Sequence, residues 1–394
     1  MKPREMKPGV YCVGAVDWDR RLFDALIPLP DGTSYNSYLV MGSEKTALID
    51  TVDPTKQEVL LNNLDELGIN HIDYVVANHA EQDHSGAIPQ VLNKFPEAKV
   101  VATPRCKDML IDLLMVDEDR FITVNDKETI PLGEKTLEFI HTPWVHWPET
   151  MVTYLREEKL LFSCDFFGSH LATTDLYADD EGRLYEAAKR YYAEIMMPFR
   201  TQIQKNLEKL AEYEIATIAP SHGPIYNEPE LILIAYHSWV LHEPENIVVL
   251  PYISMHGSTG KMVEYLVSSL VQRGVTVKQF DLTVTDIGKL AMALVDAATI
   301  VIGTPTILAG PHPNVIYAVS LVNALRPKLK YVSIIGSYGW GGRTAEQLAA
   351  MLTNLKVEIL ESVMAKGFPQ EEDFKALDDL ADVIAEKHQE DHLI

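Results

Sequence analysis

Apolar strand patterns and amphipathic helix patterns alternate regularly after residue 246, and this alternation restricts the fold more than any other feature of the chain. Short apolar runs typical of buried strands cover residues 247–253, 275–280, 299–303, 331–336 and 357–363. Between or after them, helical periodicity covers about residues 260–273, 287–295, 313–325, 344–354 and 371–388. Strand–helix–strand units of this length connect parallel strands by right-handed crossovers. The sequence therefore predicts a doubly wound parallel sheet over residues 246–394.

The chain before residue 245 has a different texture, in which short strands and helices mix without a fixed order. Two runs, 38–41 and 46–49, flank a Gly-Ser-Glu-Lys turn and predict a β-hairpin. Further strands are expected at 72–77, 99–102, 137–140 and 160–163, and helices at 56–67, 105–114 and about 186–213. Irregular sheets with helices outside them are typical of a layered α+β or αββα domain. We therefore expect an α/β multi-domain chain with one domain over residues 1–245 and another over 246–394.

The charge and the cysteines exclude several classes of function. The 34 Lys and Arg against 57 Asp and Glu give a net charge of −23, whereas nucleic-acid binding draws on a basic face. Cys12, Cys106 and Cys164 are far apart and form no C-x-x-C, so a disulfide framework, an iron–sulfur cluster or a rubredoxin-type iron site is not expected. No apolar run approaches the roughly 18 residues that span a membrane, and the N-terminus lacks a signal-peptide segment. We expect a cytoplasmic protein that binds neither nucleic acid nor membrane.

Residues 79–84, His-Ala-Glu-Gln-Asp-His, place four potential metal ligands directly after the predicted strand 72–77. Two of the four are the carboxylates Glu81 and Asp83, so the set is harder and more anionic than a cluster of imidazoles. Carboxylate plus imidazole with open positions is the preference of non-haem iron(II) rather than of zinc. A polar loop with fortuitous charges is the alternative interpretation of this segment.

Three further candidate ligands stand in loops or after strands of the first domain. His146 lies in the segment 142–148, Asp165 follows the predicted strand 160–163, and His222 precedes a Gly-Pro turn. Together with the first cluster they give four histidines and three carboxylates, the number that a dinuclear site needs if one carboxylate bridges the metals. The remaining histidines of this half are interpreted as ordinary structural residues: His71, His141, His170, His237 and His242.

Three more polar residues have two interpretations each. Asp53 could support a metal ligand from behind, but its place before Pro54 favours a helix N-cap. Tyr191 and Tyr192 lie on the predicted helix 186–213 and could approach a metal pocket, although a helix packing face is the simpler interpretation.

The order of the seven candidate ligands on a mixed α/β domain resembles the metallo-β-lactamase-like fold, in which an H-x-H-x-D-H segment usually binds zinc. The glutamate variant of that segment, joined to a flavodoxin-like domain, is similar to the flavodiiron proteins, also called A-type flavoproteins. Other similar stretches lie at 13–18, 35–40, 146–148 and 336–342. The resemblance covers essentially the whole chain. It implies an N-terminal αββα metallo-β-lactamase-like domain and a C-terminal flavodoxin-like doubly wound parallel sheet.

The resemblance also implies a chemistry. The ligands of one iron would be His79, Glu81 and His146, those of the other Asp83, His84 and His222, and Asp165 would bridge the two. The family reduces dioxygen to water, nitric oxide to nitrous oxide, or both, with electrons from FMN. An external electron donor is expected, a rubredoxin or alternatively a reduced deazaflavin. A head-to-tail homodimer, or a dimer of such dimers, is the expected assembly.

The second domain is then expected to bind FMN at the carboxyl ends of its strands, where open α/β sheets bind ligands. The first loop combines hydroxyls, glycines and backbone N–H groups at a helix N-terminus, which suits a phosphate, although ordinary turns share this composition. Tyr338 and Trp340 offer flat surfaces beside the isoalloxazine ring, with hydrophobic packing as the alternative. The candidate FMN-binding residues are Ser254, Met255, His256, Gly257, Ser258, Thr259, Pro305, Thr306, Ile307, Leu308, Ala309, Gly310, Ser337, Tyr338, Gly339, Trp340, Gly341 and Gly342.

Two other functions compete with gas reduction. The first is a zinc hydrolase of the metallo-β-lactamase-like fold with an accessory flavodoxin domain. Glu81 and the flavodoxin-like half oppose it, because a hydrolase has no use for an electron carrier. The second is an electron-transfer or gas-sensing protein in which the metal site is vestigial.

Overall fold

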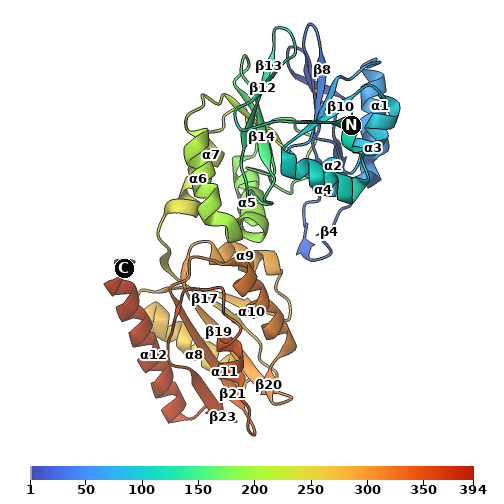
Figure 1. Cartoon of the computed structure of the whole chain (residues 1–394). Coiled ribbons are helices and arrows are strands. Elements are labelled where there is room, and N and C mark those ends of the chain that lie inside the picture. Colours follow the sequence, from blue (N-terminus) through green and yellow to red (C-terminus); the bar gives the residue numbers. More distant parts are fainter. Residues whose placement is uncertain (1) are drawn as a thin grey trace. The chain divides into compact units, whose positions relative to one another are not determined.

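The computed structural model describes residues 2–394 and divides the chain into two compact units. One unit holds the chain up to Tyr192 together with Phe199–Val240, and the other holds Ala193–Pro198 together with Leu241–Ile394. Both units combine sheets with helices (Figure 1). The domain boundary at residues 245/246 stays a prediction. Within residues 2–394, no helix combines the length and the apolar character that crossing a membrane requires.

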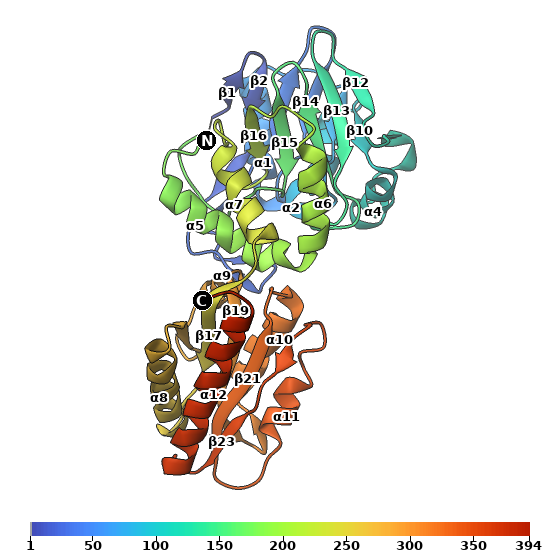
Figure 2. The same cartoon turned by 90° about the vertical axis from the view of Figure 1, so that its left-hand side faces the viewer.

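Two sheets form the centre of the first unit (Figure 2). The larger has seven strands in the order β1-β2-β7-β8-β9-β10-β11 and the smaller five in the order β12-β13-β14-β15-β16. The larger sheet contains β1 (Arg4–Lys7), β2 (Val10–Cys12), β7 (Tyr38–Met41), β8 (Thr46–Ile49), β9 (Tyr74–Val76), β10 (Lys99–Ala102) and β11 (Phe121–Thr123). The smaller contains β12 (Thr129–Pro131), β13 (Thr136–His141), β14 (Met151–Leu155), β15 (Leu160–Cys164) and β16 (Thr217–Pro220). Two further two-stranded sheets pair β3 (Ala15–Asp17) with β6 (Thr33–Tyr35) and β4 (Leu22–Phe23) with β5 (Ile27–Pro28).

Side chains that alternate along the larger sheet separate two hydrophobic layers. In β8, Leu48 packs into the core beneath the helices, whereas Ala47 and Ile49 pack into the core between the two sheets. Successive side chains of a strand point to opposite faces, so one short apolar run fills both layers. The helices cover the outer faces of the two sheets (Figures 1 and 2). The predicted αββα arrangement is confirmed.

The helices of the first unit also show where one expectation was wrong. Helices α1 (Gln57–Glu66), α3 (Ile88–Lys94) and α4 (Pro104–Leu114) lie against the larger sheet, and α5 (Glu181–Tyr191), α6 (Arg200–Leu210) and α7 (Glu230–Leu241) against the smaller. A short helix, α2 (Gln82–Ser85), follows β9. The single helix predicted at 186–213 is instead broken between α5 and α6 by a π-helical turn and a 3₁₀ turn, Tyr192–Met196 and Met197–Phe199. Pro198 stands in that break, where proline cannot donate the hydrogen bond that a continuous helix needs.

A mainly parallel sheet forms the centre of the second unit, in the order β18-β17-β19-β21-β22. In chain order this is 2-1-3-4-5, one of the two common arrangements of doubly wound folds. Its strands are β17 (Glu245–Tyr252), β18 (Thr276–Asp281), β19 (Ala297–Ile307), β21 (Tyr331–Tyr338) and β22 (Glu358–Ile359). β20 (Gly310–Pro311) pairs with β19, and β23 (Val363–Lys366) pairs with β21. The predicted parallel sheet is confirmed.

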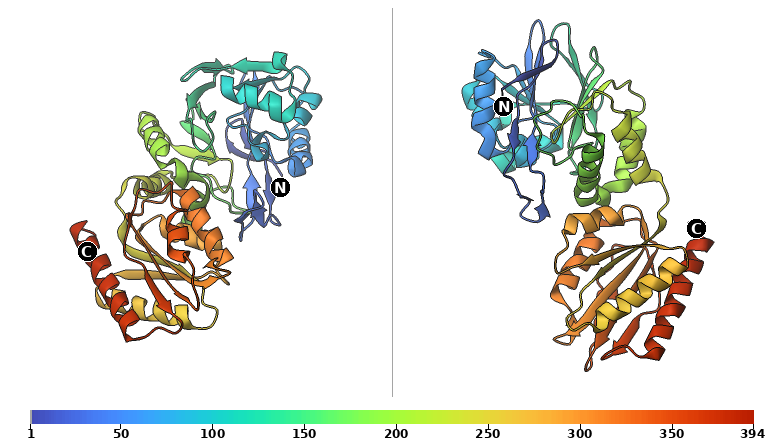
Figure 3. Two further views of the ribbon diagram at one scale, coloured as in Figure 1. Left: turned by 60° about the horizontal axis from the view of Figure 1, so that its bottom comes forward. Right: turned by 180° about the vertical axis from the view of Figure 1, so that it is seen from behind.

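Helices cover both faces of this sheet (Figure 3). Helices α8 (Ser258–Gln272) and α12 (Glu371–Glu390) share one hydrophobic core with it, and α9 (Ile287–Leu294), α10 (Pro313–Leu325) and α11 (Thr344–Ala349) share the other. The strand predicted at 357–363 is two short strands, β22 and β23, and both pair with β21. Ser333 explains the interruption, because its hydroxyl donates a 2.8 Å hydrogen bond to the carbonyl of Glu361 between them.

Candidate metal and flavin sites

Loops at the ends of four strands bring all seven predicted metal ligands together in the first unit. His79 and Glu81 follow β9, and Asp83 and His84 lie in α2 directly after them. The other three come from the loop between β13 and β14, from the end of β15 and from the end of β16: His146, Asp165 and His222. All seven are at most 9% exposed, so the cluster is shielded from water.

Glu81 gathers the first group of ligands. Its Oε2 lies 3.1 Å from Nε2 of His79 and 3.1 Å from Nε2 of His146. The ligand atoms of these three residues and of Asp165 all lie within 4.8 Å of one another. This is a compact position for one metal ion.

Asp83 gathers the second group. Its Oδ2 lies 3.1 Å from Nε2 of His222, and its Oδ1 lies 3.3 Å from Nε2 of His84. Ligand atoms of these three residues also lie within 4.8 Å of one another. These three residues therefore form a second candidate metal position beside the first.

Asp165 divides its two oxygens between the groups. Oδ2 lies 3.5 Å from Nε2 of His79 and 3.3 Å from Nε2 of His146. Oδ1 lies 2.9 Å from Nε2 of His84 and 3.5 Å from Nε2 of His222. A carboxylate with one oxygen on each group has the geometry of a bridging ligand.

Several polar atoms of the cluster lie close together without being aligned as hydrogen bonds. Both oxygens of Asp83, both ring nitrogens of His84, Nε2 of His222 and Oδ2 of Asp165 are buried without a hydrogen-bond partner. Buried polar atoms of folded proteins are almost always paired, and leaving them unpaired is costly. Atoms that converge at about 3 Å without bonding one another are placed for a shared cation. The donor set, two imidazoles and one carboxylate for each position plus a shared carboxylate, fits two irons.

Hydrogen bonds on the far side of the ligands fix their orientation. Nδ1 of His79 lies 2.6 Å from Oε1 of Glu149, a buried carboxylate that also accepts the N–H of Ala80 at 3.1 Å. Nδ1 of His222 lies 2.6 Å from the carbonyl of Ser34, to which it can only donate. Both contacts place the ring proton on Nδ1 and leave Nε2 free for a metal. Neither partner was predicted from the sequence.

Electrostatics favour the charged form of several of these side chains. Burial by itself lowers the pKa of a histidine, but hydrogen bonds with carboxylates outweigh it and raise the pKa of His79 and of His146 to about 10. The charges of Asp165 and Asp83 likewise outweigh burial and raise the pKa of His84 to about 9. Protons and metal ions therefore compete for the same nitrogens.

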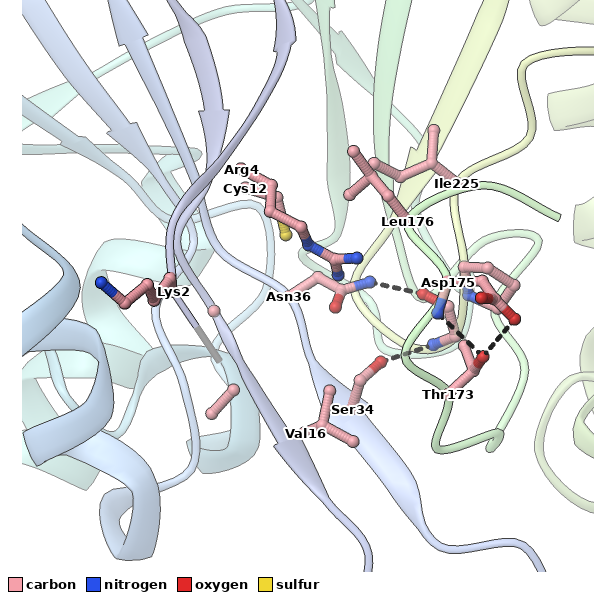
Figure 4. A pocket seen from close by; sticks show the side chains of 14 residues that line it. Lys2, Arg4, Cys12, Val16, Ser34, Asn36, Thr173, Asp175, Leu176 and Ile225 are labelled. Carbon is pink, nitrogen blue, oxygen red and sulfur yellow. Dashed lines mark hydrogen bonds between the residues drawn. The ribbon is translucent and has the colours of Figure 1, made fainter.

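The loop that carries His222 is held by a dense set of hydrogen bonds. The side-chain amide of Asn36 donates to the carbonyls of Pro220 and Gly223, at 2.8 and 2.7 Å. The N–H of Gly223 donates to the hydroxyl of Ser34 at 2.7 Å. A cavity of about 20 Å³ lies beside this clamp, lined in part by Ser34, Asn36 and Gly223 (Figure 4). That volume holds about one water molecule and is too small for a larger ligand, so we interpret the cavity as part of the packing around the loop of His222.

Tyr191 and His170, both interpreted as structural residues from the sequence, lie at the cluster. The hydroxyl of Tyr191 donates a 2.8 Å hydrogen bond to Oδ1 of Asp165, so the packing interpretation was wrong. The ring of His170 is 4.8 Å from that of His222, and its Nδ1 lies 2.9 Å from the hydroxyl of Thr33. His170 is buried, and its Nε2 has no hydrogen-bond partner.

Tyr192 and Asp53 have the roles that were favoured for them. Tyr192 packs against the aromatic rings of Tyr236 and Trp239, at 5.5 and 5.3 Å between ring centroids. Asp53 accepts the N–H of Thr55 at 2.8 Å and caps the 3₁₀ turn Pro54–Lys56.

A cavity of about 180 Å³ lies at the carboxyl ends of the strands in the second unit. Nine of the predicted FMN-binding residues line it: Met255, His256, Ser258, Thr259, Pro305, Thr306, Ser337, Tyr338 and Gly339. Gly367, which follows β23, lines it too and was not predicted, since the sequence did not show where the broken edge strand ends. The remaining candidates do not line it: Ser254, Gly257, Ile307, Leu308, Ala309, Gly310, Trp340, Gly341 and Gly342.

Two of those remaining candidates shape the first loop. The hydroxyl of Ser254 accepts the N–H of Gly260 at 2.9 Å, and Gly257 holds a left-handed φ of 90° directly before α8. Leu308 and Trp340 are 89% and 72% exposed. The alternative that Trp340 serves hydrophobic packing is therefore wrong.

Comparisons with known proteins identify the family. The sequence profile of the ODP family beta lactamases matches residues 33–223, which include all seven candidate ligands. A protein named nitric oxide reductase from Moorella thermoacetica is 37% identical over 366 residues, which cover 91% of this chain and 92% of that protein. The solved flavodiiron protein from Giardia intestinalis is 31% identical over 98% of each chain, with a TM-score of 0.90. The chain belongs to the flavodiiron protein family.

A second solved structure agrees with this assignment over the full length. The rubredoxin oxygen:oxidoreductase from the anaerobe Desulfovibrio gigas superposes with a TM-score of 0.94, 31% identity and coverage of 98% of this chain and 99% of that one. The flavodiiron architecture, a metallo-β-lactamase-like domain followed by a flavodoxin-like domain, is therefore confirmed for this chain.

Proposed function

We propose that this flavodiiron protein reduces dioxygen to water, nitric oxide to nitrous oxide, or both, at two irons in its first unit. The observation that carries the proposal is the position of Asp165, whose two oxygens face two separate groups of histidine and carboxylate ligands. A dinuclear centre with one bridging carboxylate requires this arrangement, whereas a single metal ion does not.

Each iron would have two imidazoles and one carboxylate of its own. The first position would use His79, Glu81 and His146, the second Asp83, His84 and His222, and Asp165 would be shared. Such hard ligand sets leave coordination positions open for a diatomic molecule. When bound, the irons supply electrons and a binding place for the gas, and FMN supplies the electrons that restore them.

The chain itself orients the ligands and excludes water. The candidate ligands are buried, so a gas would meet them in a site that is shielded from bulk water. Glu149 and the carbonyl of Ser34 hold the rings of His79 and His222 in the tautomer that exposes Nε2. The hydroxyl of Tyr191 holds Asp165 in place between the two groups.

FMN is proposed to bind in the 180 Å³ cavity of the second unit. Helix α8 begins at Ser258, so its first N–H groups and the hydroxyls of Ser258 and Thr259 offer an anion cradle for the phosphate. Gly339 lines the cavity, and even a Cβ added there would meet no atom within 4 Å. The backbone at Gly339 can therefore approach a flat ring or a phosphate closely.

The electron donor and the assembly follow from the same proposal. The name of the D. gigas enzyme supports a rubredoxin as the donor, with a reduced deazaflavin as the alternative. A head-to-tail homodimer, or a dimer of such dimers, would bring the FMN of one subunit to the irons of another.

Stopped-flow oxidation of the fully reduced protein by each gas tests the function directly. Iron and FMN contents are measured on the same sample. We expect iron as the metal, bound FMN, and rapid oxidation by at least one of the two gases. Zinc as the only metal, with ester hydrolysis and no gas reduction, would establish the hydrolase alternative instead.

The variant Glu81→Ala tests the metal centre. It removes the carboxylate that gathers the first ligand group, so gas reduction should be lost while FMN binding in the second unit remains. Glu118→Ala is a matched control, because Glu118 is an exposed carboxylate that pairs with Lys107 at 2.7 Å, away from the candidate ligands. Unchanged turnover in Glu81→Ala would remove the metal centre from the mechanism.

A further inference from the structure

We propose that the two metal positions are electronically unequal, and that Glu149 and Tyr191 set the difference between them from outside the ligand set. The position of His79, Glu81 and His146 is the more electron-rich one and accepts an electron second. The position of Asp83, His84 and His222 accepts an electron first. The inference rests on the proposed function in that iron occupies both positions.

Glu149 acts on the first position through His79. Its carboxylate lies 2.6 Å from Nδ1 of that histidine, and both side chains are entirely buried. A carboxylate that accepts the ring proton increases the electron donation of the imidazole to its metal. The same oxygen of Glu149 accepts the N–H of Ala80 at 3.1 Å, which holds the carboxylate against the ring. The iron bound to His79 is thereby made harder to reduce.

The second position lacks such a carboxylate. Nδ1 of His222 meets a neutral backbone carbonyl, that of Ser34, at 2.6 Å. Nδ1 of His84 is buried without a hydrogen-bond partner. Neither histidine would therefore donate as much electron density to its metal as His79 does to the first position.

Tyr191 acts in the same direction through the shared ligand. Its hydroxyl donates at 2.8 Å to Oδ1 of Asp165, the oxygen that faces His84 and His222. Oδ2, the oxygen that faces the first position, accepts no hydrogen bond. A hydrogen bond to one carboxylate oxygen draws charge away from that oxygen, so the iron next to Oδ1 receives less of it. The second iron is thereby made easier to reduce.

Two variants test the proposal from opposite sides. The two one-electron midpoint potentials of the diiron centre are measured by redox titration of the iron-loaded protein, with electron paramagnetic resonance of the half-reduced state. Glu149→Gln removes the anion at the first position and should raise the lower midpoint. Tyr191→Phe removes the hydrogen bond at Oδ1 and should depress the higher midpoint. Each variant should reduce the stability constant of the half-reduced state about tenfold, or about 59 mV in the gap between the midpoints.

Matched controls separate these effects from general loosening of the fold. Glu138→Gln alters a buried carboxylate that pairs with Arg156 at 2.6 Å, away from the ligands. Tyr226→Phe removes a buried hydroxyl that donates to the carbonyl of Phe167 at 3.0 Å. Both should leave both midpoints unchanged.

The outcomes are distinct. If both test variants shift the same midpoint, or shift theirs in the reversed sense, the assignment of the two positions is overturned. If the gap between the two midpoint potentials is as wide in each variant as in the unaltered protein, Glu149 and Tyr191 do not make the two positions unequal. The proposed function fails separately, if the unaltered protein binds iron but reduces neither gas.

Discussion

Replacing Asn36 with Ala should both destabilise the first unit and loosen one metal position. Asn36 is buried, and its amide is the donor for the carbonyls of Pro220 and Gly223, the residues on either side of the loop that ends with His222. Without the amide, the carbonyl of Gly223 loses its donor, whereas the carbonyl of Pro220 still accepts from the hydroxyl of Tyr38 at 2.6 Å. His222 then loses the support that aims its Nε2 at the second position.

The magnitude follows from those two hydrogen bonds. A buried carbonyl left without a donor costs about 1–3 kcal/mol, and the loss of one of the two hydrogen bonds to Pro220 costs about 0.5–1.5 kcal/mol more. The cavity of about 20 Å³ beside Asn36 admits water to the space that the amide leaves, which lowers the upper end of this range. We therefore expect a loss of about 1.5–4 kcal/mol in the stability of this region. Loss of an orienting contact of this kind weakens metal binding by about 10- to 100-fold, here at the second position.

Hydrogen exchange of peptides that cover β16 and the loop after it measures the stability term, because it reports on this region without assuming that the whole chain unfolds in one step. Iron content after dialysis against a weak chelator measures the metal term. Asn63→Ala is the matched control: Asn63 is also buried and also donates to two carbonyls, those of Val13 and Gly14, at 2.9 and 3.3 Å. It should cost similar stability and retain both irons. A cost below about 1 kcal/mol for Asn36→Ala, with full iron content, would refute the reasoning.

Two further predictions concern protons and flavin. Metal uptake by the metal-free protein at pH 7 should release about three protons, because the raised pKa values of His79, His84 and His146, about 10, 9 and 10, keep those rings protonated until a metal displaces the proton. Calorimetry in two buffers of different ionisation enthalpy measures this release, which should vanish above about pH 10. The same raised values stabilise the metal-free fold fully below about pH 6.5 and lose that contribution as the pH rises through 9 to 10, which thermal unfolding across this range checks. Gly336→Ala should abolish FMN binding and leave the iron content intact, since the added Cβ would lie 1.9 Å from the carbonyl oxygen of Thr304, between β21 and β19. Visible absorbance of the purified variant reports the flavin, and retained FMN would contradict the steric argument.

Four of the seven candidate ligands could be predicted from the sequence because their signal is local. His79, Glu81, Asp83 and His84 lie within one short segment directly after a strand, and charged residues gathered at the end of a buried strand are rarely there without a function. The doubly wound fold was predictable for a similar reason, since each strand and helix carries its own periodicity. Local patterns of this kind need no knowledge of the distant parts of the chain.

The partners of the ligands could not be found in this way. Glu149 is 70 residues from His79, and Ser34 is 188 residues from His222, so nothing local connects either pair. Tyr191 reaches Asp165 from the last turn of α5, which ends there because the chain turns before Pro198. Pro198 indicates in the sequence that the helix predicted at 186–213 is interrupted. A break there allows Tyr191 to face Asp165 instead of only packing along one continuous helix.

Charge balance explains why this buried cluster needs one more carboxylate than a ligand count suggests. Two divalent irons carry four positive charges, and a metal ligand must be deprotonated, so Glu81, Asp83 and Asp165 supply three negative charges. Glu149 supplies the fourth through His79, and the reduced centre with its immediate surroundings is then neutral. Without metal, protons on histidines of raised pKa offset most of the same negative charge. Buried charges are tolerated only when they are paired. Glu81 in place of a histidine would therefore do more than select a hard metal. Together with Glu149 it would let two ferrous irons sit in a neutral site that is shielded from water.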